Sequence, residues 1–243
     1  MTGDATGAEE PKRKRDRYTS RVDAALRFVA QRGILKPVVW NVVTVTVIGE
    51  ERLARLGSSF VVVANHSSHL DAPLIMGALP PKRARYLAAG AAADYFFDVW
   101  WRRGLTALFF NSFPVDRSNT HPGRVSPRAL LERGVPLLVF PEGTRSKDGS
   151  IGRFKPGAAS LAIATRSPVV PVALIGAYQA HPRGSRWPKR GRLPVAVVFG
   201  EPIAPREGEP AHELIGRVRD EVVRLHEEHA ESILNPKIEG DRP

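Results

Sequence analysis

The chain has 243 residues, 42% of them hydrophobic, which fits one large α/β domain and excludes a wholly disordered protein. It contains no cysteine, so disulfides, thiolate metal sites and a cysteine nucleophile are excluded. The formal net charge of +11 predicts either a solvated basic surface or an acidic partner. An anionic membrane ranks ahead of nucleic acid as that partner, because no zinc-finger spacing, RNP-type aromatic signature or clear helix-turn-helix occurs.

The amino-terminal part is basic. Residues 1–17 are predicted to be a disordered basic arm, and residues 18–36 an amphipathic, membrane-binding helix that Gly33 and Pro37 end. Its apolar stripe comprises Val22, Ala25, Leu26 and Val29, with the arginines elsewhere. The first residues lack the apolar core of a signal peptide, and no run of about 18 apolar residues occurs. We therefore expect peripheral, monotopic attachment at the cytoplasmic face of the cell membrane.

Strands alternate with helices through the rest of the chain, with a main domain at 37–236 and a tail at 237–243. Strands are predicted at 42–49, 60–65, 85–89, 112–116, 135–141, 169–176 and 193–200. Helices are predicted at 71–79, 93–110, 126–134, 157–166 and 211–234. This alternation predicts a single α/β domain with a mainly parallel or mixed central sheet flanked by helices, preceded by the basic amphipathic helix.

The segment NHSSHLD (65–71) places polar side chains where a buried strand ends, which is where ligands gather in such sheets. His66 and Asp71 are five residues apart and would not share a face of one helix. A strand-to-helix turn, with Ser67 or Ser68 capping the helix, could fold Asp71 back onto the imidazole. The pair would then be a general base with its orienting acid, as in a hydrolytic triad that lacks its serine. A satisfied histidine beside an ordinary helix cap is the alternative, and His69 is read as incidental.

Known motifs for a protein nucleophile or a cofactor do not occur in the sequence. It lacks GxSxG, HExxH, GxxxxGK[ST] and GxGxxG. The base would therefore activate a hydroxyl group that the substrate supplies, or a water molecule.

Two further segments combine a strand end with charged residues. FPEGTRS (140–146) carries Glu142 and Arg145 around Gly143, which permits close backbone approach, and an arginine offers a fixed fork for phosphate. FPVDR (113–117) ends in Arg117, and Lys155 lies just before a helix start that attracts anions. A plain polar turn and a surface ion pair are the structural alternatives.

NHSSHLD, FPVDR, FPEGTRS and VVPVALIG (169–176), in this order, resemble the four blocks of the phospholipid and glycerol acyltransferase family. The resemblance spans about residues 43–176. FPEGTRS matches without a gap, and His66 and Asp71 fall on the HxxxxD pair of the first block. The second block departs, because the chain has Asn111 where the family usually has glycine.

The resemblance implies transfer of an acyl group from acyl-CoA or acyl-carrier protein to the hydroxyl of a lysophospholipid. The default acceptor is 1-acyl-glycerol-3-phosphate, giving phosphatidic acid, with His66 as general base oriented by Asp71. The implied substrate-binding residues are Arg117, Glu142, Gly143, Thr144, Arg145 and Lys155. No metal is implied, and no cofactor other than the acyl donor as co-substrate.

Two alternative functions remain open. The same pair could activate water in an acyl-CoA thioesterase, or the chain could be a non-catalytic basic membrane-binding module. The aromatic segment 93–110 suits a membrane interface or the core. Trp187 and its neighbouring arginines are expected to help membrane attachment.

Overall fold

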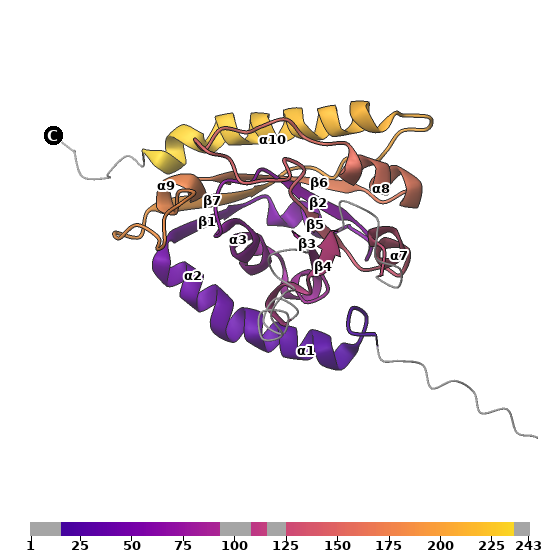
Figure 1. Cartoon of the computed structure of the whole chain (residues 1–243), viewed down its shortest axis with the longest axis horizontal. Helices are drawn as coiled ribbons and strands as arrows, with labels where there is room; N and C mark the ends of the chain where they lie inside the picture. Colours follow the sequence, from indigo (N-terminus) through magenta and orange to yellow (C-terminus); the bar gives the residue numbers. More distant parts are fainter. Residues whose placement is uncertain (1–15, 93–107, 116–124, 236–243) are drawn as a thin grey trace, which may run out of the picture.

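The computed structural model describes residues 16–92, 108–115 and 125–235, and Figure 1 shows its elements. The helical elements are α1 (Arg21–Ala30), the π-helical η1 (Gln31–Leu35), α2 (Lys36–Val42), the 3₁₀ turn η2 (Glu50–Leu53), α3 (Asp71–Ala78), α4 (Pro81–Ala84), α7 (Pro127–Glu132), α8 (Gly157–Thr165), α9 (Ala177–Ala180) and α10 (Ala211–Leu234). The strands are β1 (Thr44–Ile48), β2 (Val61–Ala64), β3 (Ala88–Ala92), β4 (Phe113–Val115), β5 (Leu137–Val139), β6 (Val169–Ile175) and β7 (Pro194–Phe199).

The seven strands form one mixed sheet in the order β1-β7-β6-β2-β5-β3-β4. All neighbouring pairs are parallel except β6 and β7, which are antiparallel. β2 lies between β6 and β5, so the carboxyl ends of these three central strands lie at the same edge of the sheet. The fold class predicted from the sequence is confirmed.

Helices cover both faces of the sheet. Successive strand residues point to opposite sides, and in β2 the residues on both sides are apolar and buried. Val62 and Ala64 join the core beneath α2 and α3, whereas Val61 and Val63 join the core beneath α7, α8 and α10. In Figure 1, α10 runs along one side of the sheet and the α1–α2 segment along the other. The sheet is therefore a rigid middle layer from whose edge the turns after β2 and β5 project.

The amino-terminal helix differs from its prediction in length, and its apolar stripe faces outward, as a membrane-binding helix requires. Gly33 and Pro37 do not end it, because the π-helical turn η1 joins α1 to α2. Pro37 directly follows this π-helical turn, and the helix continues through it to Val42. The predicted apolar stripe is exposed along its whole length, and Arg27 and Gln31 are buried instead.

Other boundaries also shifted. Arg85 and Tyr86, predicted as strand, lie in a turn after the unpredicted helix α4, and β3 begins at Ala88. Most of the aromatic segment 93–110, the arm up to residue 15 and the tail from residue 236 lie outside the described residues.

Candidate active site

The strand β2 is fixed at its carboxyl end by a buried amide. The Asn65 side chain donates from Nδ2 to the Leu174 carbonyl (3.0 Å) and accepts from the Leu174 N–H (2.8 Å). These two bonds join the end of β2 to β6 in the manner of an extra backbone pair. The position of His66, the next residue, is therefore set by the sheet.

The chain then turns and brings Asp71 back to the imidazole, as the sequence predicted. His66 Nδ1 lies 2.8 Å from Asp71 Oδ2, and the same oxygen accepts the backbone N–H groups of Ser67 (2.6 Å) and Ser68 (2.8 Å). Asp71 is 0% exposed and His66 is partly exposed. An ionised carboxylate only accepts hydrogen bonds, so Nδ1 carries the hydrogen and Nε2 is the ring atom left to accept a proton.

The expectation that Ser67 or Ser68 caps α3 was wrong. The residue before the helix is Leu70, which makes no side-chain cap, and the Asp71 carboxylate takes the turn's free N–H groups. The Ser68 hydroxyl instead accepts from the Leu70 N–H (3.2 Å) and donates to the His181 carbonyl (2.9 Å). Asp71 thus holds the turn and the imidazole with one oxygen.

The turn after β5 supports His66 from the other side. Glu142 accepts the His66 N–H at Oε1 (2.8 Å) and the Gly152 N–H at Oε2 (3.3 Å), and the Ser146 N–H donates to the His66 carbonyl (2.7 Å). The Phe140 ring stacks on the imidazole with centroids 4.1 Å apart. Burial raises the pKa of Glu142, against the lowering effect of its two backbone donors. FPEGTRS therefore holds both backbone groups of His66.

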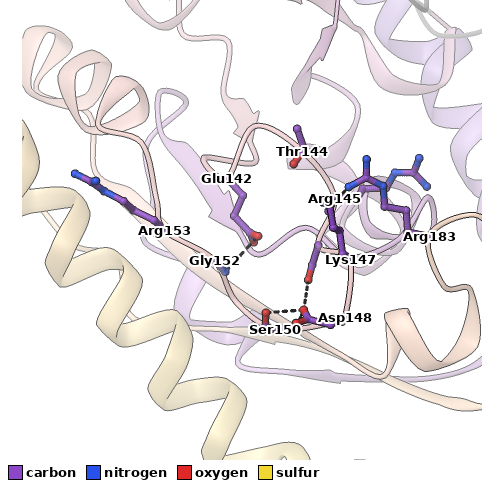
Figure 2. A pocket seen from close by; sticks show the side chains of 10 residues that line it. Glu142, Thr144, Arg145, Lys147, Asp148, Ser150, Gly152, Arg153 and Arg183 are labelled. Atoms are coloured by element: carbon purple, nitrogen blue, oxygen red, sulfur yellow. Dashed lines mark hydrogen bonds between the residues drawn. The ribbon is translucent and has the colours of Figure 1, made fainter.

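A cavity of about 250 Å³ opens beside this turn, and Figure 2 shows its lining. Arg145 and Arg183 lie side by side there, and Arg183 Nη1 donates to the Arg145 carbonyl (2.8 Å). Arg153 points away from that pair. The complete lining is Glu142, Thr144, Arg145, Ser146, Lys147, Asp148, Ser150, Gly152, Arg153 and Arg183.

Partial burial and neighbouring positive charge lower the pKa of His69, the second histidine of the turn. The pKa of His69 is lowered, first by burial and then by Arg145, His181 and His66. The His69 ring lies 5.8 Å from the His181 ring, centroid to centroid. This corner of the molecule therefore favours neutral imidazole at His69, next to a cluster of positive charge.

The structure brings most of the predicted site residues together. One corner, at the carboxyl ends of β2 and β5, contains six of them: His66, Asp71, Glu142, Gly143, Thr144 and Arg145. Gly143 has φ +78°, and a Cβ built there would lie 3.0 Å from Lys155 Nζ, so Lys155 also reaches the turn without lining the cavity. Arg117 lies outside the described residues.

The departure at Asn111 has a backbone explanation. Asn111 has φ +48° and is buried, and its Nδ2 donates to the Tyr86 carbonyl (3.2 Å). Asparagine enters this left-handed region more readily than most residues, so it can replace the glycine that the family usually has here.

Sequence reasoning missed Asn65 as a strand clamp, Ser146 as a backbone donor to His66, and Arg183. A polar residue at the end of the apolar run 60–64 was the available signal for Asn65.

The residues in the described ranges include no group of three or more metal-binding side chains placed to hold an ion. None of the helices in those ranges combines the length and apolar character needed to cross a membrane.

The fold and this corner define an α/β protein with a carboxylate-oriented histidine and an adjoining cationic pocket. A profile of the family described as acyltransferase matches residues 44–175, more than half of the chain. The chain therefore belongs to the acyltransferase family.

Several relatives carry a more specific name. Proteins named 1-acyl-sn-glycerol-3-phosphate acyltransferase are similar to this chain, one from Cocos nucifera at 28% identity over 75% of the chain and an alpha form from Bos taurus at 30% over 70%. The chain spans 57% and 58% of the length of these two relatives. The crystal structure of PlsC from Thermotoga maritima, a 1-acyl-sn-glycerophosphate acyltransferase, matches with a TM-score of 0.67 and 27% identity. That match covers 88% of this chain and 86% of PlsC.

Proposed function

We propose that the chain transfers a fatty acyl group from a thioester, acyl-CoA or acyl-carrier protein, to the free hydroxyl of 1-acyl-glycerol-3-phosphate, giving phosphatidic acid. One observation carries the chemistry: the fully buried Asp71 holds His66 Nδ1 at 2.8 Å and leaves Nε2 as the acceptor on a partly exposed ring. The names of the relatives support the acceptor.

The reaction needs one base and no covalent intermediate, because a thioester is already activated. His66 Nε2 takes the proton of the acceptor hydroxyl as its oxygen bonds to the thioester carbon. The carbon–sulphur bond then breaks, and the imidazolium returns the proton to the leaving thiolate. Asp71 keeps the imidazole in the required tautomer and stabilises the imidazolium.

The distance from the reacting hydroxyl to the acceptor's phosphate favours Arg145 as a phosphate ligand. Four bonds separate that oxygen from the phosphorus, and an extended chain advances about 3.5 Å for every three bonds, so the phosphate lies within ~5 Å. Arg145 immediately precedes Ser146, whose N–H donates to the His66 carbonyl. We propose that Arg145 binds this phosphate, with Arg117 and Lys155 as further cations and with Gly143 and Thr144 shaping the turn. Glu142 organises the site by holding the His66 backbone.

An anionic membrane is proposed as the surface from which the lipid acceptor enters, at the cytoplasmic face. Val22, Leu26 and Val29 of α1 are 59%, 55% and 64% exposed, on a chain of net charge +11. Apolar side chains beside basic ones are typical of helices that lie in a membrane interface.

The test is acyl transfer from radiolabelled oleoyl-CoA by the wild-type chain and by His66→Ala. We expect wild-type transfer to 1-acyl-glycerol-3-phosphate, and a loss of about 10²–10⁴ in rate in a variant that keeps its circular dichroism spectrum. Thiol release that does not depend on acceptor would establish the thioesterase instead. Turnover retained by a folded His66→Ala variant would show that His66 is not the general base.

The acceptor assignment is tested separately with Arg145→Ala. Its KM should rise more for 1-acyl-glycerol-3-phosphate than for the same lipid without its phosphate, because only the former presents an anion. Equal effects on the two acceptors would remove Arg145 as a phosphate ligand.

A further inference from the structure

The loop between α9 and β7, residues 181–192, carries more charge than the catalytic corner uses, that corner being His66, Asp71 and the turn 140–146. It contains five cations, Arg183, Arg186, Lys189, Arg190 and Arg192, and no acidic residue. Arg183 and Arg192 are tied to the Arg145 and Trp40 carbonyls. The side chains of Arg186, Lys189 and Arg190 are exposed and make no hydrogen bond or ion pair with any residue in the described ranges.

An unpartnered aromatic ring lies among these charges. Trp187 is 76% exposed, the largest exposed fraction of any large hydrophobic side chain in the described ranges. Nothing in those ranges stacks on its ring. A free indole beside free guanidinium and ammonium groups has the composition that binds a nucleotide, with stacking for the base and cations for the phosphates.

The loop begins at the catalytic corner and is closed on itself. The Ser68 hydroxyl donates to the His181 carbonyl (2.9 Å), and the Lys189 N–H donates to the Ala180 carbonyl (2.8 Å). Trp187 follows His181 by six positions, a span of at most ~21 Å even when fully extended. Figure 1 shows this orange segment projecting near the end of α2, where Arg192 is bonded.

The chemistry of the two substrates separates the two groups of cations. The acceptor's phosphate lies within ~5 Å of the reacting oxygen, which suits Arg145 in the catalytic turn. In coenzyme A, thirteen bonds separate the thioester sulphur from the first phosphate, or up to ~15 Å. Cations that start at the catalytic corner and extend away from it therefore match the donor's phosphates.

We propose that the 181–192 loop binds the nucleotide of acyl-coenzyme A, with Trp187 stacked on the adenine and Arg186, Lys189 and Arg190 on the phosphates. This rests on the proposed acyl transfer and identifies coenzyme A as the donor. A carrier protein presents the same pantetheine arm without a purine, which would leave the Trp187 ring without its partner.

The first experiment compares two donors, oleoyl-CoA and S-oleoyl-4′-phosphopantetheine, which lacks the adenosine and the further phosphates. Trp187→Ala should raise the KM for oleoyl-CoA about tenfold and leave the KM values for oleoyl-phosphopantetheine and for the lipid acceptor unchanged. Trp187→Phe should restore most of the affinity, because a phenyl ring still stacks. Arg190→Ala should raise the KM for oleoyl-CoA, whereas the matched control Arg128→Ala, on α7, should not.

The second experiment reads binding without catalysis. Isothermal calorimetry on the full chain should detect adenosine 3′,5′-bisphosphate, with binding weakened in Trp187→Ala and by added salt. If the wild type transfers no acyl group but binds the bisphosphate through Trp187, the proposed function fails while the nucleotide site stands.

Several results would overturn the proposal. These are equal KM increases for the two donors, a defect confined to acyl-carrier protein, and absence of bisphosphate binding to the wild type. Lost binding to anionic vesicles with unchanged kinetics on soluble donors would instead make Trp187 a membrane anchor.

Discussion

The corner around His66 and Asp71 and the amino-terminal helix both bury a charged side chain, and they expose opposite kinds of surface. In the corner, the Asp71 carboxylate lies inside and a polar ring nitrogen of His66 is left available. In the helix, the Arg27 guanidinium lies inside, 2% exposed, and apolar side chains face outward. In both places hydrogen bonds to backbone groups compensate for the burial, which leaves the outer face free for function.

The helix is attached to the domain by arginines bound to carbonyls. Arg27 donates from Nε to the Arg85 carbonyl (2.8 Å) and from Nη2 to the Arg17 carbonyl (3.0 Å). Arg32 donates to the Gly77 carbonyl (2.9 Å) and to the Leu79 carbonyl at the carboxyl end of α3, where a helix attracts cations. Burial lowers the pKa of Arg27 to about 10, so its charge persists at neutral pH.

The largest expected effect is in the corner, from Asp71→Asn. Three N–H groups converge on Asp71 Oδ2, whereas Oδ1 is buried without a partner among the described residues. An amide would lose the charge that stabilises the imidazolium and would leave its NH₂ group unpaired or facing donors. We expect transfer to fall about 10²–10⁴-fold with a nearly unchanged KM for the acceptor, measured by steady-state kinetics. A loss confined to KM would contradict the orienting role.

A smaller effect is expected on the helix, from the double variant Leu26→Ser/Val29→Ser. Both side chains are exposed, so the fold should be unaffected, while about 2–3 kcal/mol of membrane affinity should be lost. Sedimentation with anionic vesicles should show binding roughly 30–150-fold weaker. The control Leu26→Ile/Val29→Leu keeps the apolar area and should bind as the wild type does. Equal binding by all three proteins would show that the exposed face of α1 does not contact the membrane.

Next in size is Arg27→Met, which tests how the helix is held. Methionine fills similar space but leaves the Arg85 and Arg17 carbonyls without their donor, so we expect the free energy of unfolding to fall by about 1–3 kcal/mol in urea denaturation. The control Arg21→Met is on the exposed side of α1 and should change little. Stability equal to or above that of the wild type would mean that the burial of the guanidinium outweighs its hydrogen bonds.

The burial of the run 61–64 and the common edge of its parallel neighbours could be predicted from local pattern, which placed His66 and Asp71 at a strand-to-helix turn. Their spacing alone left open a histidine beside an ordinary helix cap, and it was the family resemblance of NHSSHLD and FPEGTRS that favoured the His66–Asp71 pair. The link from Glu142 to the His66 N–H could not be read, because it depends on which strand lies beside β2. The spacing of residues within each segment says nothing about strand order.

The helix shows what a hydrophobic pattern leaves open. The stripe of Val22, Leu26 and Val29 was correctly seen as one face, but periodicity alone does not say whether that face meets the core or the solvent. Arg27 decides the orientation through carbonyls that are 10 and 58 positions away in the sequence. Contacts of that kind follow from the tertiary structure and leave no local signal.

The smallest expected effect concerns pH and lies outside both regions, at His226 on α10. Burial lowers the pKa of His226 below its ordinary value of 6.5, partly offset by Glu227. The unfolded chain therefore binds a proton at His226 more readily than the folded chain does. The free energy of unfolding should be level above about pH 6.5 and should decline as the pH falls from 6.5 towards the folded pKa. His226→Gln removes this titration, so its Tm should fall less than that of the wild type between about pH 8 and about pH 5.5, with unchanged transfer at neutral pH. Identical losses of Tm in the two proteins would show that protonation of His226 does not oppose folding.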